Sequence, residues 1–478
     1  MVAQHAAVPA FSRLSAQDCS RLHEASLEIL ARTGVKLQAA AAVEMLRAAG
    51  AQATGDRVRI PPELVAWALS VAPKEVTLHD RSGRPAMVCS GDAAYFGPGS
   101  DCLNIIDHRT FERRKPILDD VRDGQTVVDA LGEMSFAMSM FLPTDVDTRI
   151  ADRYQMEIML SRTTKPIVFV TYDTRGMVDC LDMAEAVAGG PEALRERPSI
   201  AGYINVTRAL FQNDDALQKL LLLADRGIPA IWIPVTSGGT TGPVTSAGNV
   251  ALNNAGVLVG VVLSQLRHEG APIVIPGFAG DALDLRTLVD PYAEPDHRGM
   301  AEAMAHYYGL PMFSLAGGSD SKVVDQQAAL EAALTLLTDA LAGGHITHDS
   351  GYLESGLTGS LAQLAICDEI ISWIRPLLAP VEISAETLAL DVIDEVGPDG
   401  SFLEAEHTLR HYRERWYPDL IDRLNHSAWQ ARGGKTLAER AADRVSGILA
   451  SHECEPLAPD VAGALHTIVE RAEAAVGL

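Results

Sequence analysis

The chain has 478 residues, of which 47% are hydrophobic, so it can bury a large core. Its formal net charge of −24 makes nucleic acids and anionic membranes poor partners, because both are bound through basic patches. The first residues lack the basic start and apolar run of a signal peptide, and no uninterrupted apolar stretch reaches the ~18 residues of a membrane span. We therefore expect a cytoplasmic globular protein.

The six cysteines are isolated along the chain, with no Cys-x-x-Cys pair. We interpret them as reduced and mostly buried thiols. His345 and His348 offer metal-ligand chemistry, but residues three apart on a strand point to opposite faces of the sheet. We expect no zinc site and no catalytic cysteine.

Residues 1–90 are predicted to form a helical region with a small β element, packed on the next domain. Ser15 or Asp18 can cap a helix that ends before Gly34. The segment PPELVAWALSVAP predicts a second, short helix with proline in its first turn.

From residue 91 to 380, short apolar runs alternate with helical segments. We predict strands at 94–96, 134–142, 166–172, 200–206, 229–235, 272–278, 311–315 and 345–348. Runs such as IVFV and IWIPV are continuously apolar, as parallel strands buried on both faces require. The fold class is therefore α/β, and eight strands favour a (β/α)₈ TIM-type barrel over an open doubly wound sheet, which remains the alternative. The apolar stretch 250–266 is predicted to be a buried barrel helix.

After residue 380 the chain becomes charged, with helical segments predicted at 386–397 and 407–424. We expect residues 381–478 to be a C-terminal helical extension packed on the barrel.

In such a barrel the active site lies in the loops after the strands. The segment FSLAGGSDSK, residues 313–322, leads from a strand through two glycines, and Ser319 or Asp320 is expected to cap a helix over 323–342. Asp320 either caps that helix or lines the pocket. Lys322 is either a solvated residue of the first helical turn or lines the pocket, and these interpretations stay open. The SGGTTG loop at 237–242 lacks the spacing of a phosphate-binding loop, so its glycines indicate a tight turn or a close ligand approach.

These segments, together with LHEASLEILARTGV, SGGTTGPVTSAGNVALNNAGVLVG and HITHDSGYLESG, resemble the trimethylamine methyltransferase family over nearly the whole chain. The resemblance implies a (β/α)₈ barrel, a methylated amine as substrate, and a separate corrinoid protein as methyl acceptor.

Archaeal members of that family carry pyrrolysine in the loop that matches FSLAGGSDSK. The matching position here is Gly317, with Gly318 adjacent. The chain therefore resembles the branch without pyrrolysine, whose substrates are glycine betaine and related quaternary amines. The resemblance gives Gly317 as a candidate catalytic position, and the loop itself adds Asp320 and Lys322 as candidates.

A quaternary ammonium cannot donate hydrogen bonds, so aromatic faces and carboxylates must recognise it. Strand alternation puts Trp232 on the side of Pro234, where it can face outward under a helix. The candidate substrate-binding residues, taken from the predicted strand ends and loops, are Tyr95, Phe96, Tyr172, Arg208, Trp232, Phe278, Phe313, His348, Tyr352 and Glu354.

The leading hypothesis is thus methyl transfer from a quaternary amine to Co(I) of a corrinoid protein or cobalamin. Transfer from another methylated amine or to a folate, and a barrel that binds quaternary amines without turnover, are the alternatives. A homo-oligomer is left open.

Overall fold

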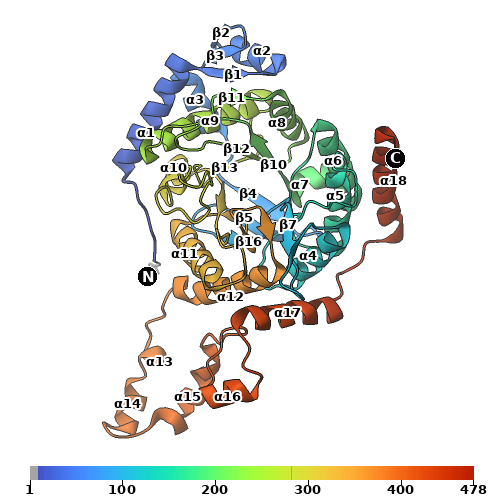
Figure 1. Ribbon diagram of the computed structural model, residues 1–478. Helices are drawn as coiled ribbons and strands as arrows, with labels where there is room; N and C mark the ends of the chain where they lie inside the picture. Colours follow the sequence, from blue (N-terminus) through green and yellow to red (C-terminus); the bar gives the residue numbers. More distant parts are fainter. Residues whose placement is uncertain (1–8, 281, 478) are drawn as a thin grey trace.

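The computed structural model describes residues 9–280 and 282–477 (Figure 1). Its centre is a barrel of parallel strand segments, which are β6 (Tyr95–Phe96), residues 134–138, β9 (Ile167–Phe169), β10 (Ile200–Val206), β12 (Ala230–Pro234), β13 (Ile273–Pro276), β14 (Met312–Leu315) and β15 (Ile346–His348). The ring closes through residues 134–138, because Met134 bridges Phe96 and Ala137 bridges Ile167. The predicted (β/α)₈ barrel is confirmed, and the open-sheet alternative is wrong.

The N-terminal end of the barrel is plugged. The hairpin of β4 (Val76–His79) and β5 (Pro85–Cys89) inserts Leu78 and Met87 among inward-facing side chains such as Phe136 and Ile231. Because all four side chains are fully buried, the floor has no room for a ligand. Only the carboxyl end of the strands remains open.

Helices cover the outside of the barrel, as continuously apolar strands require. They are α4 (Leu118–Ala130), α5 (Ala151–Arg162), α6 (Thr174–Ala188), α7 (Pro191–Glu196), α8 (Asp214–Arg226), α9 (Ser246–Arg267), α10 (Met300–Tyr308), α11 (Gln326–Ala342) and α12 (Leu361–Leu378). Among the described residues, α9 is the one helix long and apolar enough to cross a membrane, and 78% of its apolar window is buried inside the protein. It is a core helix, as predicted.

The N-terminal region packs on α9. Ser15 caps α1 (Ala16–Glu28) in a capping box with Asp18, and a π-helical turn then ends at Gly34, in agreement with the prediction. The remaining elements are β1 (Val35–Leu37), α2 (Ala40–Ala48), β2 (Gln52–Thr54), β3 (Arg57–Arg59) and the predicted proline-led helix α3 (Pro62–Val71).

The helix after the 313–322 loop starts later than predicted. Asp325 caps α11, its carboxylate accepting from the Ala328 amide at 3.0 Å, so the expected cap by Ser319 or Asp320 is wrong. The preceding residues form an irregular turn instead, because the Ser321 hydroxyl donates to Asp325 at 2.9 Å and to the Val323 carbonyl at 3.0 Å.

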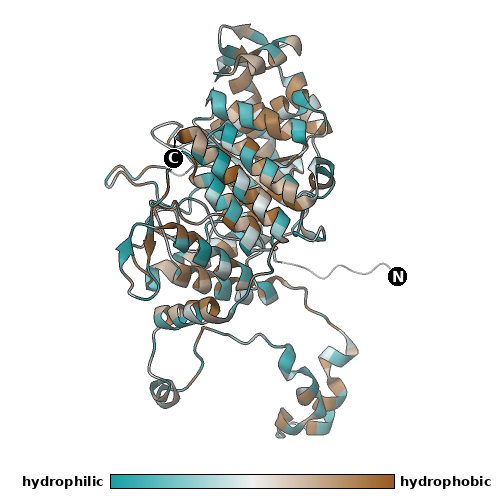
Figure 2. Cartoon of the chain, turned by 90° about the vertical axis from the view of Figure 1, so that its right-hand side faces the viewer, coloured by the Kyte–Doolittle hydropathy of each residue, from teal (hydrophilic) through white to brown (hydrophobic). Residues whose placement is uncertain are grey.

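The C-terminal extension divides into two parts. Helix α17 (Leu437–Ser451) packs on α12 and α4, and α18 (Pro459–Val476) packs on α5 and α6. The segment before them carries α13 (Ala385–Leu388), α14 (Leu390–Val396), α15 (Glu406–His411) and α16 (His426–Ala431), and it projects away from the barrel (Figures 1 and 2). The helix predicted over 407–424 is shorter than expected, since α15 stops at His411 and only a 3₁₀ turn, Tyr412–Glu414, follows it.

Candidate active site

A buried carboxylate marks the open end of the barrel. Asp349 follows the last residue of β15 and has φ +82°, a left-handed conformation that costs a non-glycine residue energy. Its Oδ2 accepts a hydrogen bond from the Tyr292 hydroxyl, and its Oδ1 lies 3.5 Å from Nε2 of His348. Burial raises the pKa of Asp349, and the neighbouring His348 opposes that shift.

Aromatic rings from neighbouring strands converge beside this carboxylate. The His348 imidazole stacks on Phe313 with ring centroids 4.0 Å apart, and Tyr203 lies 4.9 Å from Phe313. The ring of Phe278 lies 6.0 Å from His348. His348 is fixed by a contact of 2.6 Å between its Nδ1 and the Ser314 carbonyl, so Nδ1 carries the donated proton and Nε2 faces Asp349.

A second, half-buried carboxylate faces the same region. Asp101, with φ +61°, accepts from Gln155 Nε2 at 2.8 Å and from the Ser139 hydroxyl at 3.0 Å. Burial raises its pKa also. Within residues 9–280 and 282–477, no lysine or arginine forms an ion pair with Asp101 or Asp349. A buried and a half-buried carboxylate without a lysine or arginine partner favour a cationic ligand.

A cavity of about 170 Å³ opens beside these rings, at the carboxyl ends of β12, β13 and β14. Phe278 and Tyr292 form part of its wall, and His297, Arg298 and Glu302 lie deeper. Nδ1 of His297, Nε of Arg298 and Oε2 of Glu302 are buried without a hydrogen-bond partner in the described structure. The volume matches about five waters, which suits a small organic ligand.

Tyr292 is held in place from both sides. The Asp320 carboxylate accepts from its amide at 2.8 Å, and the Arg298 guanidinium donates to its carbonyl at 2.7 Å. These contacts position the hydroxyl that donates to Asp349, although Tyr292 lies in an irregular loop between β13 and α10.

The two glycines of the 313–322 loop face different ways. A Cβ on Gly317, which has φ +86°, would meet Ser350 at 2.9 Å and Leu336 of α11 at 3.3 Å. A Cβ on Gly318 would lie 2.4 Å from the ring of Tyr292 and 3.6 Å from Cβ of Tyr352. It is therefore Gly318, the neighbour of the expected position, whose missing side chain borders the aromatic rings.

The predicted aromatic candidates separate into two groups. Phe278, Phe313 and His348 lie in the site, and Tyr352 lies beside it, donating to the Ser100 carbonyl at 2.5 Å. Four others lie elsewhere. The Tyr95 hydroxyl accepts from Val88 at the plugged floor, Phe96 lies outside the barrel under Arg375, Tyr172 is exposed, and Trp232 faces outward against α9 as its alternation predicted.

The predicted polar candidates lie mostly outside the site. Lys322 is exposed and donates to the Asp320 carbonyl at 2.6 Å, while Arg208 is exposed in the turn after β10. Glu354 pairs with Arg113 at 2.9 Å on the outer surface. Asp320 acts on the site only through Tyr292.

Sequence analysis missed four residues of the site, namely Asp101, Tyr203, Tyr292 and Asp349. Strand alternation places Tyr203 on the inward side with Ala201, and Asp349 directly follows the chosen His348, so both carried a usable signal. Asp101 and Tyr292 lie in loops without any periodic pattern.

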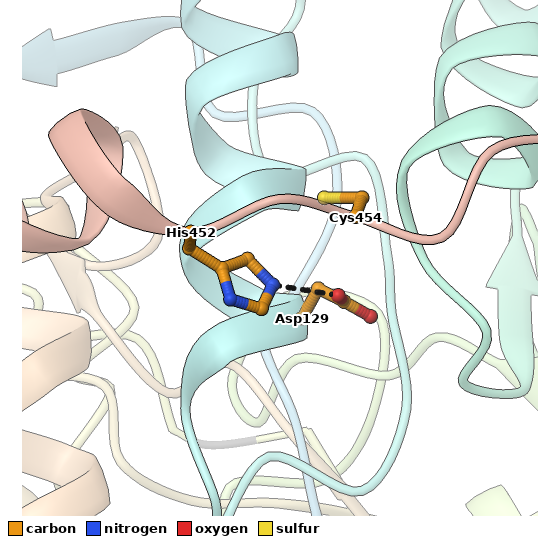
Figure 3. A group of neighbouring side chains, drawn as sticks. All are labelled: Asp129, His452 and Cys454. Atoms are coloured by element: carbon orange, nitrogen blue, oxygen red, sulfur yellow. Dashed lines mark hydrogen bonds and ion pairs between the residues drawn. The ribbon is translucent and has the colours of Figure 1, made fainter.

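Metal-like side-chain clusters in the described residues lie far from the barrel mouth. In one, His452 Nε2 lies 2.8 Å from Asp129, with Cys454 nearby (Figure 3). The other oxygen of Asp129 accepts from the Thr163 hydroxyl at 2.7 Å. Because both oxygens of the Asp129 carboxylate have a hydrogen-bond partner, the cluster acts as a structural link between α4 and the segment after α17. A second cluster, Glu386, His407 and His411, lies on the projecting segment.

The comparison with known families agrees with this geometry. A family model described as Trimethylamine methyltransferase (MTTB) matches residues 2–477. The chain belongs to this family. Trimethylamine methyltransferase MttB of Desulfitobacterium hafniense is 32% identical over 97% of this chain and 94% of its own length. The glycine betaine methyltransferase of the same species is 28% identical over 98% of this chain and 99% of its own.

A solved structure supports the fold of this family member. The monomethylamine methyltransferase MtmB of Methanosarcina barkeri superposes with a TM-score of 0.53 at 13% identity, covering 92% of this chain and 89% of its own. The likeness extends over nearly the whole chain, so it shares the barrel architecture with that enzyme.

Proposed function

We propose that this methyltransferase transfers a methyl group from a quaternary amine, bound at the barrel mouth, to the Co(I) of a corrinoid protein. The observation that carries the proposal is Asp349, a buried carboxylate that pairs with no lysine or arginine in the described structure and lies 3.5 Å from the His348 imidazole, close to the rings of Tyr203 and Phe313. Carboxylates and aromatic faces are the two groups that bind a cation lacking N–H donors.

The site suits a substrate that already carries its positive charge. When the cobalt nucleophile attacks the methyl carbon, a new bond to that carbon forms and the C–N bond breaks. The bonding pair stays on nitrogen, which leaves as a neutral tertiary amine. No proton moves, so the site needs orientation and exclusion of water rather than a general base.

Gly318 supports the choice of a quaternary over a tertiary amine. It offers no side chain for activating trimethylamine. Because it also has no Cβ, the Tyr292 ring can lie against it and donate to Asp349. The curated relatives named for glycine betaine and for trimethylamine make both substrates worth testing.

The corrinoid acceptor fits the open end of the barrel. The floor is closed by β4 and β5, so a large partner can reach the site only from the carboxyl ends of the strands, where Asn205 and Val235 are exposed. We place the reaction in the cytoplasm. Folate as acceptor, or binding without turnover, is the competing proposal.

The test is methyl transfer to Co(I) cobalamin, followed by the change in its visible spectrum. Asp349→Asn should lower kcat/KM for a quaternary amine at least tenfold, because the buried counter-charge is lost. Glu354→Gln is the matched control, since that carboxylate pairs with Arg113 on the surface, and it should retain activity. Equal activity of the Asp349→Asn variant and the wild type would refute this site, and no turnover with any quaternary amine would favour the binding protein.

A further inference from the structure

The segment of residues 381–424, called the arm below, exposes an unusual amount of apolar surface. The arm holds 44 residues, yet it carries 11 of the 28 exposed large apolar side chains of the described structure. No residue from 381 to 419 is buried. Val381, Ile383, Leu390 and Leu403 are each more than 60% exposed.

This apolar surface is as large as a protein interface. Eleven such side chains present on the order of 1,000 Å², whereas a soluble monomer rarely exposes a patch above a few hundred Å². Each partner of a standard interface contributes about 800 Å². The arm's helices are also too short to be stable alone in water, so they require packing against another surface.

The arm leaves the barrel at the end opposite the active site. Helix α12 starts near the mouth, where Ser360 donates to the Gly351 carbonyl at 2.9 Å. It ends at the floor, where the Arg375 guanidinium donates to the Ala94 carbonyl at 3.0 Å, at the start of β6. A methyl acceptor must approach the mouth, so the arm, which starts at the floor, is not positioned to bind this acceptor.

The charges of the arm are unevenly distributed. Residues 381–406 contain eight acidic residues and no lysine or arginine, whereas residues 407–424 carry Arg410, Arg413, Arg415 and Arg423 together with Glu414, Asp419 and Asp422. Helix α14 is both acidic and apolar, with Asp391, Asp394 and Glu395 beside exposed Leu390 and Ile393. Within the described structure these three carboxylates form no ion pair with their own chain.

A groove that matches α14 lies at the root of the arm. It has a volume of about 630 Å³ and lies between the end of α12 and the returning chain. Trp373 of α12 stacks on Trp416 at 5.6 Å, and Leu377, Arg415 and Arg423 complete its wall. The groove therefore offers apolar faces flanked by two guanidinium groups and by the single carboxylate of Glu414, while the chain's own α14 lies at the far end of the arm (Figure 1).

We propose that the arm binds a second copy of this chain, and that α14 of each copy occupies the groove of the other. Arg415 and Arg423 of one copy then face Asp391, Asp394 and Glu395 of its partner. A two-fold axis repeats the contact, so the acidic α14 of each copy meets the two groove arginines of the other and both apolar faces are covered.

The test is sedimentation velocity on the full chain at micromolar concentrations. Asp391→Lys with Glu395→Lys, and separately Arg415→Glu with Arg423→Glu, should each halve the mass of the wild-type assembly. An equimolar mixture of the two variants should restore it, because opposite charges then meet at both contacts. Leu390→Asp should also halve the mass, whereas Leu330→Asp, at an exposed position on α11, should not.

Circular dichroism checks that each variant is folded. A monomeric wild type would overturn the proposal, as would a mass unchanged in the charge variants. A mixture that stays dissociated would also contradict the proposal, because α14 of one copy and the groove of the other would then not face each other. Binding of the arm to a corrinoid protein but not to a second copy would equally contradict it.

Discussion

A Cβ placed on Gly318 would lie 2.4 Å from the ring of Tyr292, so this ring fills the space that a side chain at residue 318 would need. Tyr292 in turn donates to Asp349. Any side chain at residue 318 therefore displaces the ring and breaks that hydrogen bond.

We predict that Gly318→Ala lowers kcat/KM at least tenfold, because Tyr292 can no longer position Asp349. The value of kcat/KM is measured from methyl transfer to Co(I) cobalamin. Gly463→Ala is the control, since that α18 glycine has open space around its Cβ position and should leave turnover unchanged. Full activity of Gly318→Ala would show that Tyr292 is not needed.

The raised pKa of Asp349 predicts a pH-dependent affinity for quaternary cations. Only the carboxylate form attracts the cation, so affinity should rise with pH until the carboxyl is ionised and then level off. Binding lowers the pKa and so releases protons. Calorimetry with tetramethylammonium, in buffers of different ionisation enthalpy across about pH 5–8, detects this release. Asp349→Asn should flatten the dependence of affinity on pH, leaving only the slope from Asp101.

The same linkage predicts how the cation affects stability. Because the folded state holds the Asp349 proton more tightly than the unfolded chain, stability falls as pH rises through this range. The cation offsets that loss, so tetramethylammonium should raise the melting temperature more at high pH than at low pH. An equal rise at all pH values would contradict a carboxylate in the site.

Phe278→Leu tests the aromatic contribution. The ring forms part of the cavity wall and is not fully buried, so the barrel should tolerate leucine. A cation–π contact worth about 0.5–2 kcal/mol predicts roughly 2- to 30-fold weaker binding of a quaternary amine. Calorimetry compares this variant with Tyr172→Leu, which changes an exposed aromatic residue away from the site. An equal effect of both changes on binding would argue against recognition of the cation by the aromatic rings.

The Asp129–His452 contact predicts a stability effect instead of a metal effect. Hydrogen bonds lower the pKa of Asp129 despite its burial, so the contact stabilises the fold above the usual Asp pKa and is lost as pH falls through the lowered value. His452→Ala should cost on the order of 1 kcal/mol in unfolding free energy near neutral pH. Zinc should leave the wild-type melting temperature unchanged, and a rise on adding stoichiometric zinc would contradict this interpretation.

The sequence predicted the barrel because its strands are continuously apolar and follow one another regularly. It predicted the outward Trp232 from alternation. It could not place Tyr292, because the loop between β13 and α10 has no period and the contact with Asp349 spans 57 residues. Which of Gly317 and Gly318 borders the aromatic rings also required the backbone, because it depends on where a Cβ would point at each position.

The most direct test of the account compares substrates. Methyl transfer to Co(I) cobalamin is measured with glycine betaine, carnitine, choline and trimethylamine at equal concentrations. The account predicts turnover with at least one quaternary amine and a rate at least tenfold lower with trimethylamine. If trimethylamine is the best substrate, a residue other than Gly318 must activate it, and the assignment of the site to a quaternary ammonium is wrong.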